Sequence, residues 1–406
     1  MAEIKVPFHR AAITKAEEDA VLDVLRSGWL TTGKYALEFE KKFSSAVSQG
    51  DKEAGREPVI SLAVNSNTSG MILAMEACGV CQGTAVITTP YTFVSTATCA
   101  RHLGADVFFA DIEKDTYSID PDKIEEILKK DSENGRKVRA IVPVHIAGNV
   151  CNMKRILELA EKYSTPQNKI RVIEDAAHSF PSPTSLGYAG AIGDVGVFSF
   201  YVTKTITTAE GGMVCTRDPE LAKRMTVMRM HGMDRTTWDR YTSPRASWEY
   251  DIIAPGYKFN LPDVLAAIGT CQVDRAWTFY EQRKAIVDMY NKAFANLDFI
   301  ELPPDGEGNS WHLYLMRIVP DKVKITREQF AKKMQEAGLG ISVHFIPIFH
   351  FTYWRELYHD FTAQNFPNAE NQYNRTISIP LFPDMTIEQA QLVIDTVKTI
   401  GTENHA

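Results

Sequence analysis

Residues 171–216 read RVIEDAAHSFPSPTSLGYAGAIGDVGVFSFYVTKTITTAEGGMVCT, and the rest of the chain is interpreted from them. The stretch begins with an apolar strand that ends in Glu174 and Asp175. A Gly/Pro/Ser loop leads to a second apolar strand, VGVFSF, which runs into Lys204 and then a Gly-Gly turn. In a sheet of alternating strands and helices, residues just beyond the carboxyl ends of strands face the ligand crevice. Asp175 and Lys204 are therefore expected in one cleft.

Two interpretations of this acid–amine pair are open. A lysine shielded from water has a lowered pKa and becomes a nucleophilic amine that forms a Schiff base. Pyridoxal phosphate uses such a lysine at its aldehyde and a carboxylate at its pyridinium nitrogen, which makes the ring an electron sink. The other interpretation is an ordinary salt bridge at two strand ends, since structural ion-pair networks resemble such sites.

The stretch resembles the DegT/DnrJ/EryC1/StrS family of fold-type I pyridoxal-phosphate enzymes, which supply amino groups to nucleotide-linked keto-sugars. The resemblance is carried by four motifs: EDAAHS at 174–179, GD at 193–194, SFYVTK at 199–204 and T-x-E-G-G-M at 208–213. It extends over nearly the whole chain. It implies an α/β fold: a large pyridoxal-phosphate domain with a mostly parallel sheet at 1–270, then a spine helix and a small α+β domain at 271–406.

Composition narrows the class of partner. The 406 residues are 44% hydrophobic and 23% charged, as in a soluble globular protein. A net charge of -7 with no basic run argues against nucleic acid and acidic membranes. No signal-peptide core or transmembrane run is visible, and six cysteines in apolar contexts suit a reducing compartment, so we expect a cytoplasmic protein. The spacing of His and Cys predicts no metal site.

A second strand ends in NSNTSG at 65–70, and a helix is predicted from near Thr68. The N–H groups and dipole of a helix N-terminus attract phosphate, although this pattern alone is also an ordinary N-cap. The resemblance favours Thr68, Ser69 and Ser199 as ligands of the cofactor phosphate.

The resemblance also assigns residues around the cofactor ring. Phe93, in PYTF at 90–93, is expected to stack on the ring, with Tyr91 as the second candidate and core packing as the alternative for both. His178 is expected beside the ring near Asp175, or as a hydrogen-bond partner behind it.

Residues 229–263 are too long for a plain connection, which favours a functional loop. The family has a loop here that reaches the neighbouring subunit's active site, so an obligate homodimer with shared sites is expected. Lys258 or Asn260 is predicted to contact the partner's cofactor phosphate. Arg245 is either a ligand of the substrate diphosphate or surface charge.

The resemblance further implies contacts to the nucleotide-sugar. The expected residues are Trp29 and Thr31 in the GWLTTG turn, Tyr201, and His344 and His350 around IPIFHF. For the turn and the IPIFHF region, structural packing is the alternative.

Several elements are predicted from local patterns. Thr14 and Glu17 predict a capped helix at 13–26, residues 49–58 read as a polar surface insertion, and a long helical segment starts near Pro262. In the C-terminal part we expect strands at HLYLMRIV and ISVHF, and helices at 326–338 and 386–400.

The resemblance implies an aminotransferase in which Lys204 carries the proton between two half-reactions. The expected donor is L-glutamate, and the acceptor is C4 of a UDP-4-keto-sugar in lipopolysaccharide or polysaccharide biosynthesis. The match is strongest to members that include the 4-amino-arabinose enzyme of lipid A modification. Three alternatives remain: a sugar dehydratase, which would have histidine in place of Lys204; an enzyme that aromatises a carbocycle; and a non-catalytic regulator, which would lose Lys204 or Asp175.

Overall fold

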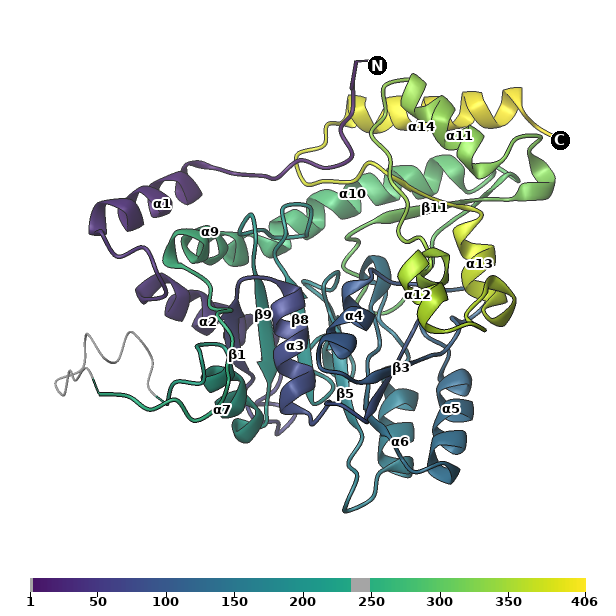
Figure 1. The fold of residues 1–406 in the computed structure, drawn as a ribbon. Helices are drawn as coiled ribbons and strands as arrows, with labels where there is room; N and C mark the ends of the chain where they lie inside the picture. Colours follow the sequence, from purple (N-terminus) through teal and green to yellow (C-terminus); the bar gives the residue numbers. More distant parts are fainter. Residues whose placement is uncertain (1–2, 235–248) are drawn as a thin grey trace.

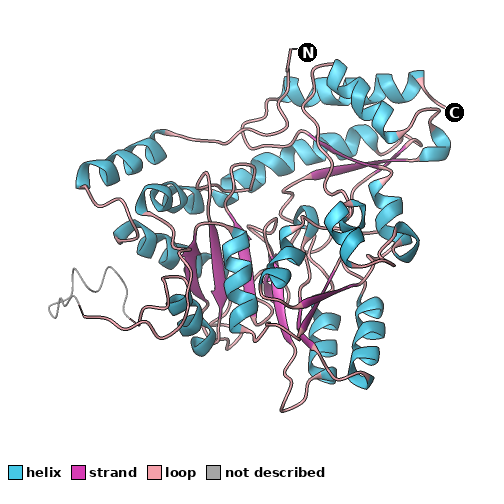
Figure 2. Cartoon of the chain, in the orientation of Figure 1, coloured by secondary structure: helices cyan, strands magenta, loops and turns pink. Residues whose placement is uncertain are grey.

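The computed structural model describes residues 3–234 and 249–406, and strands alternate with helices through most of its length (Figures 1 and 2). The helices are α1 (Lys15–Ser27), α2 (Lys34–Val47), α3 (Asn67–Ala77), α4 (Ser95–His102), α5 (Pro121–Glu133), α6 (Met153–Tyr163), α7 (Pro219–Met228), α9 (Asp263–Asp274), α10 (Ala276–Phe294), α11 (Arg327–Glu336), α12 (Thr352–Leu357), α13 (Pro367–Tyr373) and α14 (Ile387–Glu403). The strands are β1 (Ile60–Val64), β2 (Ala85–Thr88), β3 (Asp106–Phe109), β4 (Val138–Ile141), β5 (Arg171–Asp175), β6 (Pro183–Thr184), β7 (Gly187–Tyr188), β8 (Val195–Ser199), β9 (Gly212–Thr216), β10 (Ile300–Glu301), β11 (Tyr314–Ile318) and β12 (Thr376–Ile379).

Within the described residues, seven strands form the central sheet in the order β1-β9-β8-β5-β4-β2-β3. β9 pairs antiparallel with both of its neighbours, and the other pairs are parallel. This confirms the predicted α/β fold with a mostly parallel sheet. Because the parallel strands end at one edge, the loops that follow them meet there.

Helices cover both faces of this sheet, because successive side chains of each strand point to opposite sides. On one face, Leu62 and Val64 of β1 join a core with α3, α4 and α7. On the other face, Ala63 joins aromatic side chains of α2, while Ala85 and Ile87 of β2 pack with α5 and α6. The result is a three-layer α/β/α arrangement (Figure 1).

The N-terminus of α2 is capped from a distant part of the chain. The carboxylate of Asp263, the first residue of α9, accepts hydrogen bonds from the backbone N–H groups of Gly33, Tyr35 and Ala36, at 2.7, 3.1 and 3.0 Å. Asp263 is 2% exposed. It therefore satisfies donors at the start of a helix whose own N-cap, Gly33, has no side chain.

The C-terminal part has its own sheet and core. β10, β11 and β12 form an antiparallel sheet, which packs with α10, α11 and α14. The predicted helical segment after Pro262 is present as two helices, which meet at Arg275. The strand predicted at 341–345 is wrong: only Ser342 forms an isolated bridge, to Ser378 of β12.

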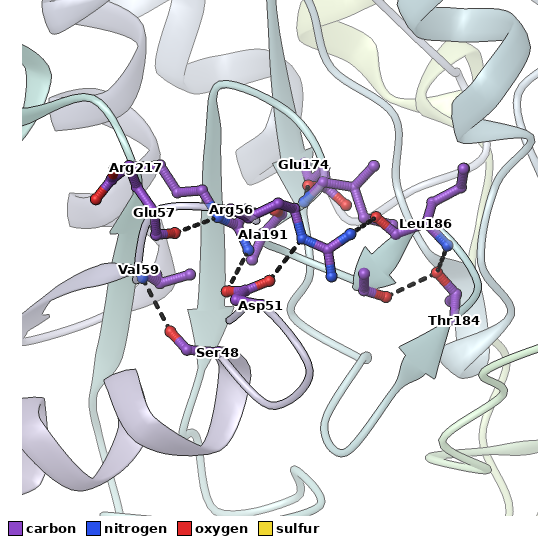
Figure 3. Close-up of polar contacts among 12 residues, drawn as sticks. Ser48, Asp51, Arg56, Glu57, Val59, Glu174, Thr184, Leu186, Ala191 and Arg217 are labelled. Atoms are coloured by element: carbon purple, nitrogen blue, oxygen red, sulfur yellow. Dashed lines mark hydrogen bonds and ion pairs between the residues drawn. The ribbon is translucent and has the colours of Figure 1, made fainter. Parts of the chain in front are cut away.

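The polar insertion at 49–58 is anchored to the central domain by a buried carboxylate (Figure 3). Asp51, 3% exposed, accepts hydrogen bonds at 2.7 Å from both Arg56 and Arg217. Arg217 also donates to the carbonyl of Ala191, and Arg56 to that of Leu186 in the β6–β7 hairpin. The prediction of a surface insertion did not include this anchor, which ties the segment to β9 and to the proline-containing loop after β5.

Candidate active site

Asp175 and Lys204 lie on the wall of one cavity of about 350 Å³ at the carboxyl edge of the central sheet. This volume falls within the range of small-molecule sites, roughly 300–1,000 Å³. Its walls come from the loops after β2, β4, β5 and β8, the N-termini of α3 and α4, and the residues before β9. Three residues of the C-terminal part, His312, His344 and Phe345, complete them. The expected meeting of acid and amine in one cleft is thus what the structure has.

The carboxylate of Asp175 is held by donors from three elements. Thr96 of α4 donates to Oδ2 at 2.7 Å, and the N–H of Ala177 and the amide of Asn67 point to Oδ1 at 3.2 and 3.4 Å. Burial raises the pKa of Asp175, while these hydrogen bonds and the charge of Lys204 oppose the rise. A protonated ring nitrogen in the cavity would stabilise the ionised carboxylate further.

Lys204 lies in a turn after β8, in which its N–H donates to the carbonyl of Tyr201 at 2.9 Å. Burial lowers the pKa of its amine from 10.5 to about 8, and the charge of Asp175 limits this fall. At pH 7 about a tenth of the amine would then be neutral, against far less for an exposed lysine. This is the state that a nucleophilic or basic amine needs.

The N-terminus of α3 forms another wall of the cavity. Ser66, the N-cap, accepts a hydrogen bond from the N–H of Ser69 and lines the cavity together with Asn67 and Thr68. Ser199 of β8 is also on the wall. The hydroxyl of Ser69 donates to Asn65 at 2.6 Å, so of the predicted phosphate ligands Thr68 and Ser199 face the cavity and Ser69 lies behind them.

The two aromatic candidates are separated by the structure. Phe93 is 58% exposed and lines the cavity, with its ring centroid 6.1 Å from that of Phe345. Tyr91 is fully buried and donates to the carbonyl of His344 at 3.1 Å, so it belongs to the core behind the site. Phe93 is the ring that is free to stack on a ligand.

Neutral imidazoles surround Lys204. The N–H of Ala147 donates to Nδ1 of His178 at 3.0 Å, so this nitrogen carries no proton. Burial and the charge of Lys204 hold the pKa of His178 and His312 well below the usual range, and they lower that of His344 to about 3. The three neutral imidazoles can form hydrogen bonds with a ligand. They add no positive charge, so the charge of Lys204 is not joined by others in its interaction with the carboxylate of Asp175.

Most of the other predicted residues that the structure describes lie away from this cavity. Asn260 donates to Thr32 at 2.7 Å, Lys258 is exposed and contacts the sulfur of Met230, and His350 pairs with Glu370 at 2.7 Å. Tyr201 is on the cavity wall, whereas Trp29 and Thr31 are in a turn next to Asp263. Arg245 lies outside the described residues.

Sequence reasoning missed three side chains of the site. Asn67 was within the quoted NSNTSG motif, and His312 begins a predicted strand, where a polar residue before an apolar run was a usable signal. Thr96 carried no signal, because nothing in the sequence distinguishes a threonine inside a helix from one that the fold brings to Asp175.

In residues 3–234 and 249–406, no cluster of His, Cys, Asp or Glu side chains is arranged to hold a metal ion, and no helix has the length and apolarity to cross a membrane.

The donor set fits pyridoxal phosphate. It combines a buried carboxylate, an amine with a lowered pKa, an exposed aromatic ring, and hydroxyls at the N-terminus of an 11-residue helix. The carboxylate suits a pyridinium nitrogen, the amine a carbonyl carbon, and the helix N-terminus a phosphate.

Comparisons with known proteins agree with this chemistry. Residues 11–398 match the model of the DegT/DnrJ/EryC1/StrS aminotransferase family. The Bacillus subtilis spore coat polysaccharide biosynthesis protein SpsC is 38% identical over 398 residues, 97% of each chain. The structure of Spr1654 from Streptococcus pneumoniae, assigned as a sugar aminotransferase and solved in its PMP form, superposes with a TM-score of 0.88 at 30% identity, covering 98% of this chain and 100% of that one. Helicobacter pylori PseC, an aminotransferase involved in the biosynthesis of pseudoaminic acid, has a TM-score of 0.83 at 26% identity over 98% and 99% of the two chains. The chain therefore belongs to the DegT/DnrJ/EryC1/StrS family of pyridoxal-phosphate-dependent sugar aminotransferases.

Proposed function

We propose that this enzyme transfers an amino group from L-glutamate to a nucleotide-linked keto-sugar, at C4 of a UDP-4-keto-sugar. The observation that carries the proposal is the shared cavity of Lys204 and Asp175, with an amine whose pKa is about 8. A saccharide acceptor is supported by relatives that act in spore coat polysaccharide and pseudoaminic acid biosynthesis.

The cavity residues would hold pyridoxal phosphate as follows. Asp175 would keep the ring nitrogen protonated, and Phe93 would stack on the ring. Thr68, Ser199 and the N–H groups of α3 would receive the phosphate, and His178, on the wall of the same cavity, would lie beside the ring. When bound, the cofactor accepts the amino group at its aldehyde carbon and absorbs the electron pair left by the departing α-proton.

Lys204 carries the proton in both half-reactions. Its neutral amine removes the α-proton of the donor, which leaves as 2-oxoglutarate after hydrolysis. In the second half-reaction the ammonium form of Lys204 returns a proton to the sugar carbon that receives the amino group. Product release between the two halves gives ping-pong kinetics.

A homodimer with shared active sites is part of the proposal, and the structure favours Lys258 as the residue that reaches the partner's cofactor phosphate. Asn260 is buried and bonded to Thr32 of its own chain. Lys258 is exposed. Its amine is partly shielded from water by neighbouring atoms, and this partial desolvation lowers its pKa. We place the enzyme in the cytoplasm, where nucleotide-sugars are made.

The test is the visible absorption of the purified enzyme loaded with pyridoxal phosphate. L-Glutamate should remove the band of the bound cofactor, and the correct nucleotide keto-sugar should restore it. Lys204→Ala should lower turnover about 1,000-fold or more while the protein stays folded, whereas Lys162→Ala, a surface lysine paired with Glu125, should not. A band that no amino acid changes would contradict the proposal, and a band that only other keto compounds restore would exclude the sugar acceptor.

A further inference from the structure

Arg283 of α10 is a buried arginine that the proposed reaction does not use. It is 2% exposed. Its guanidinium donates to the carbonyls of Trp311, Ser310 and Thr205, at 3.1, 3.2 and 3.5 Å. Among the described residues no carboxylate pairs with it, so backbone carbonyls alone balance its charge.

These carbonyls belong to the two segments that carry cavity side chains. Thr205 directly follows Lys204, and Ser310 and Trp311 directly precede His312. The planar guanidinium of Arg283 on α10 therefore holds two segments: the turn of Lys204 and the residues before His312, which lines the same cavity.

The segment before His312 is strained and needs support. Trp311 has a φ of 49°, in the left-handed region that bulky residues rarely adopt. Such a conformation persists only where surrounding contacts over-determine it. The bond from Arg283 to the Trp311 carbonyl is one such contact, and the hydroxyl of Ser310, which donates to the carbonyl of His178, is another.

Packing alone does not explain an arginine here. Burying a cation without a carboxylate partner is unfavourable, and an apolar side chain of similar volume would avoid that loss. Burial lowers the pKa of Arg283 to about 9, so the guanidinium remains mostly charged at neutral pH. Among the side chains only arginine provides a rigid planar group with five N–H donors, which can hydrogen-bond to several carbonyls at once.

We propose that Arg283 is a positioning residue: its guanidinium sets the place of the Lys204 turn relative to the segment of His312. The inference rests on the proposed function only in taking Lys204 as the reactive amine. Replacement by lysine keeps the charge but loses the planar set of donors, so the turn should relax toward solvent and the pKa of the Lys204 amine should rise part of the way toward its ordinary value.

The test measures Lys204 in the cofactor-free protein, by pH-dependent labelling with an amine-reactive acetylating reagent and mass spectrometry of the Lys204 peptide. In Arg283→Lys the midpoint should rise by about one pH unit, which lowers labelling at pH 7 about tenfold. The control is Arg317→Lys: this buried arginine donates to the carbonyls of Asp115 and Leu302 and also pairs with Glu301, and it lies in β11, away from Lys204. It should leave the Lys204 midpoint unchanged. The groups around Lys204, namely Asp175, His9, His178, His312 and His344, are the same in all proteins compared.

An Arg283→Lys protein that melts earlier but labels Lys204 like the parent would overturn the inference, because its role would then be structural only. If this variant does not fold, Arg283→Gln decides by the same criterion, since its shorter planar amide cannot donate to the carbonyls of Thr205, Ser310 and Trp311 at once. A parent protein with an ordinary Lys204 midpoint near 10.5 would count against the reactive amine of the proposed function instead, so the two failures are distinct.

Discussion

The Thr96 hydroxyl donates a 2.7 Å hydrogen bond to Oδ2 of Asp175 from the first turn of α4. Both residues are buried, and the hydroxyl of Thr92 lies 3.0 Å from that of Thr96. A helix on one face of the sheet thus orients the carboxylate that a strand places at the edge of the cavity.

Thr96→Val should weaken cofactor binding about tenfold and lower kcat/KM by roughly 10–100-fold. The substitution keeps the shape but leaves a buried carboxylate oxygen without a donor, which costs about 1.5–3 kcal/mol and raises the pKa of Asp175 further. Titration with pyridoxal phosphate and steady-state kinetics measure both effects. Thr98→Val on the same helix removes a hydroxyl bonded only to backbone carbonyls and should stay within about twofold of the parent. Equal behaviour of the two variants would show that Thr96 does not orient Asp175.

The stability of the cofactor-free enzyme should rise with pH between about 8 and 10.5 relative to Lys204→Met. The folded state lowers the pKa of Lys204 from 10.5 to about 8, so in this window the unfolded chain binds more protons. Below pH 8 Lys204 is protonated in both the folded and the unfolded state, so burial of its charge destabilises the folded state in full. Above pH 10.5 Lys204 is neutral in both states, and this destabilisation is absent. Unfolding free energies of the two proteins should converge by at most about 3 kcal/mol across the window. A pH-independent difference would mean that Lys204 is not desolvated.

Asp263→Ala should destabilise the protein by about 2–3 kcal/mol, seen as a Tm lower by roughly 2–5 °C at equal protein concentration. The substitution removes the charged acceptor of three N–H groups at the start of α2. Because Asp263 is buried, water does not readily replace it as their acceptor. Asp274→Ala removes an exposed carboxylate at the other end of α9, where it pairs with Lys42, and should change Tm little. A similar Tm loss in both variants would argue against the cap.

Asp51→Ala should open the insertion at 49–58 to proteases and lower stability by about 2 kcal/mol. Removing the shared carboxylate leaves Arg56 and Arg217, both partly shielded, without their ionic partner. Limited trypsin digestion, followed by mass spectrometry, reports cleavage at Lys52 and Arg56. Glu53→Ala changes the net charge equally at an exposed position and should digest like the parent. Unchanged digestion of Asp51→Ala would show that other contacts hold the segment.

Much of the fold was predictable from local pattern. Strand ends at Asp175 and after Ser199, and the helix that starts near Thr68, follow from apolar runs and polar caps. The wrong strand at 341–345 has a physical reason. Its alternating pattern is that of a strand, but most of its backbone does not pair with β12, and two of its side chains, His344 and Phe345, turn to the cavity instead.

The support of the site was not predictable in this way. Arg283 is far from Lys204 in sequence, and nothing in a helical pattern distinguishes an arginine that donates to backbone carbonyls from one in solvent. The same holds for Thr96. Long-range contacts of single polar side chains depend on the packed arrangement of elements, which periodicity does not encode.

The reversed direction of β9 bears on how firmly Lys204 is held. Elsewhere in a parallel sheet the chain leaves the ligand edge through a helix, so a loop there is anchored at one strand only. Here residues 200–211 return at once to β9, where Gly212 pairs with Ser199, and the N–H of Phe200 donates to the carbonyl of Gly211. Lys204 is thus carried by a closed loop with both ends in the middle of the sheet. The two strands that carry the loop are expected to stay in place when the smaller sheet moves during substrate entry, and the bond from Arg283 of α10 to Thr205 is a contact through which such a motion reaches the Lys204 turn.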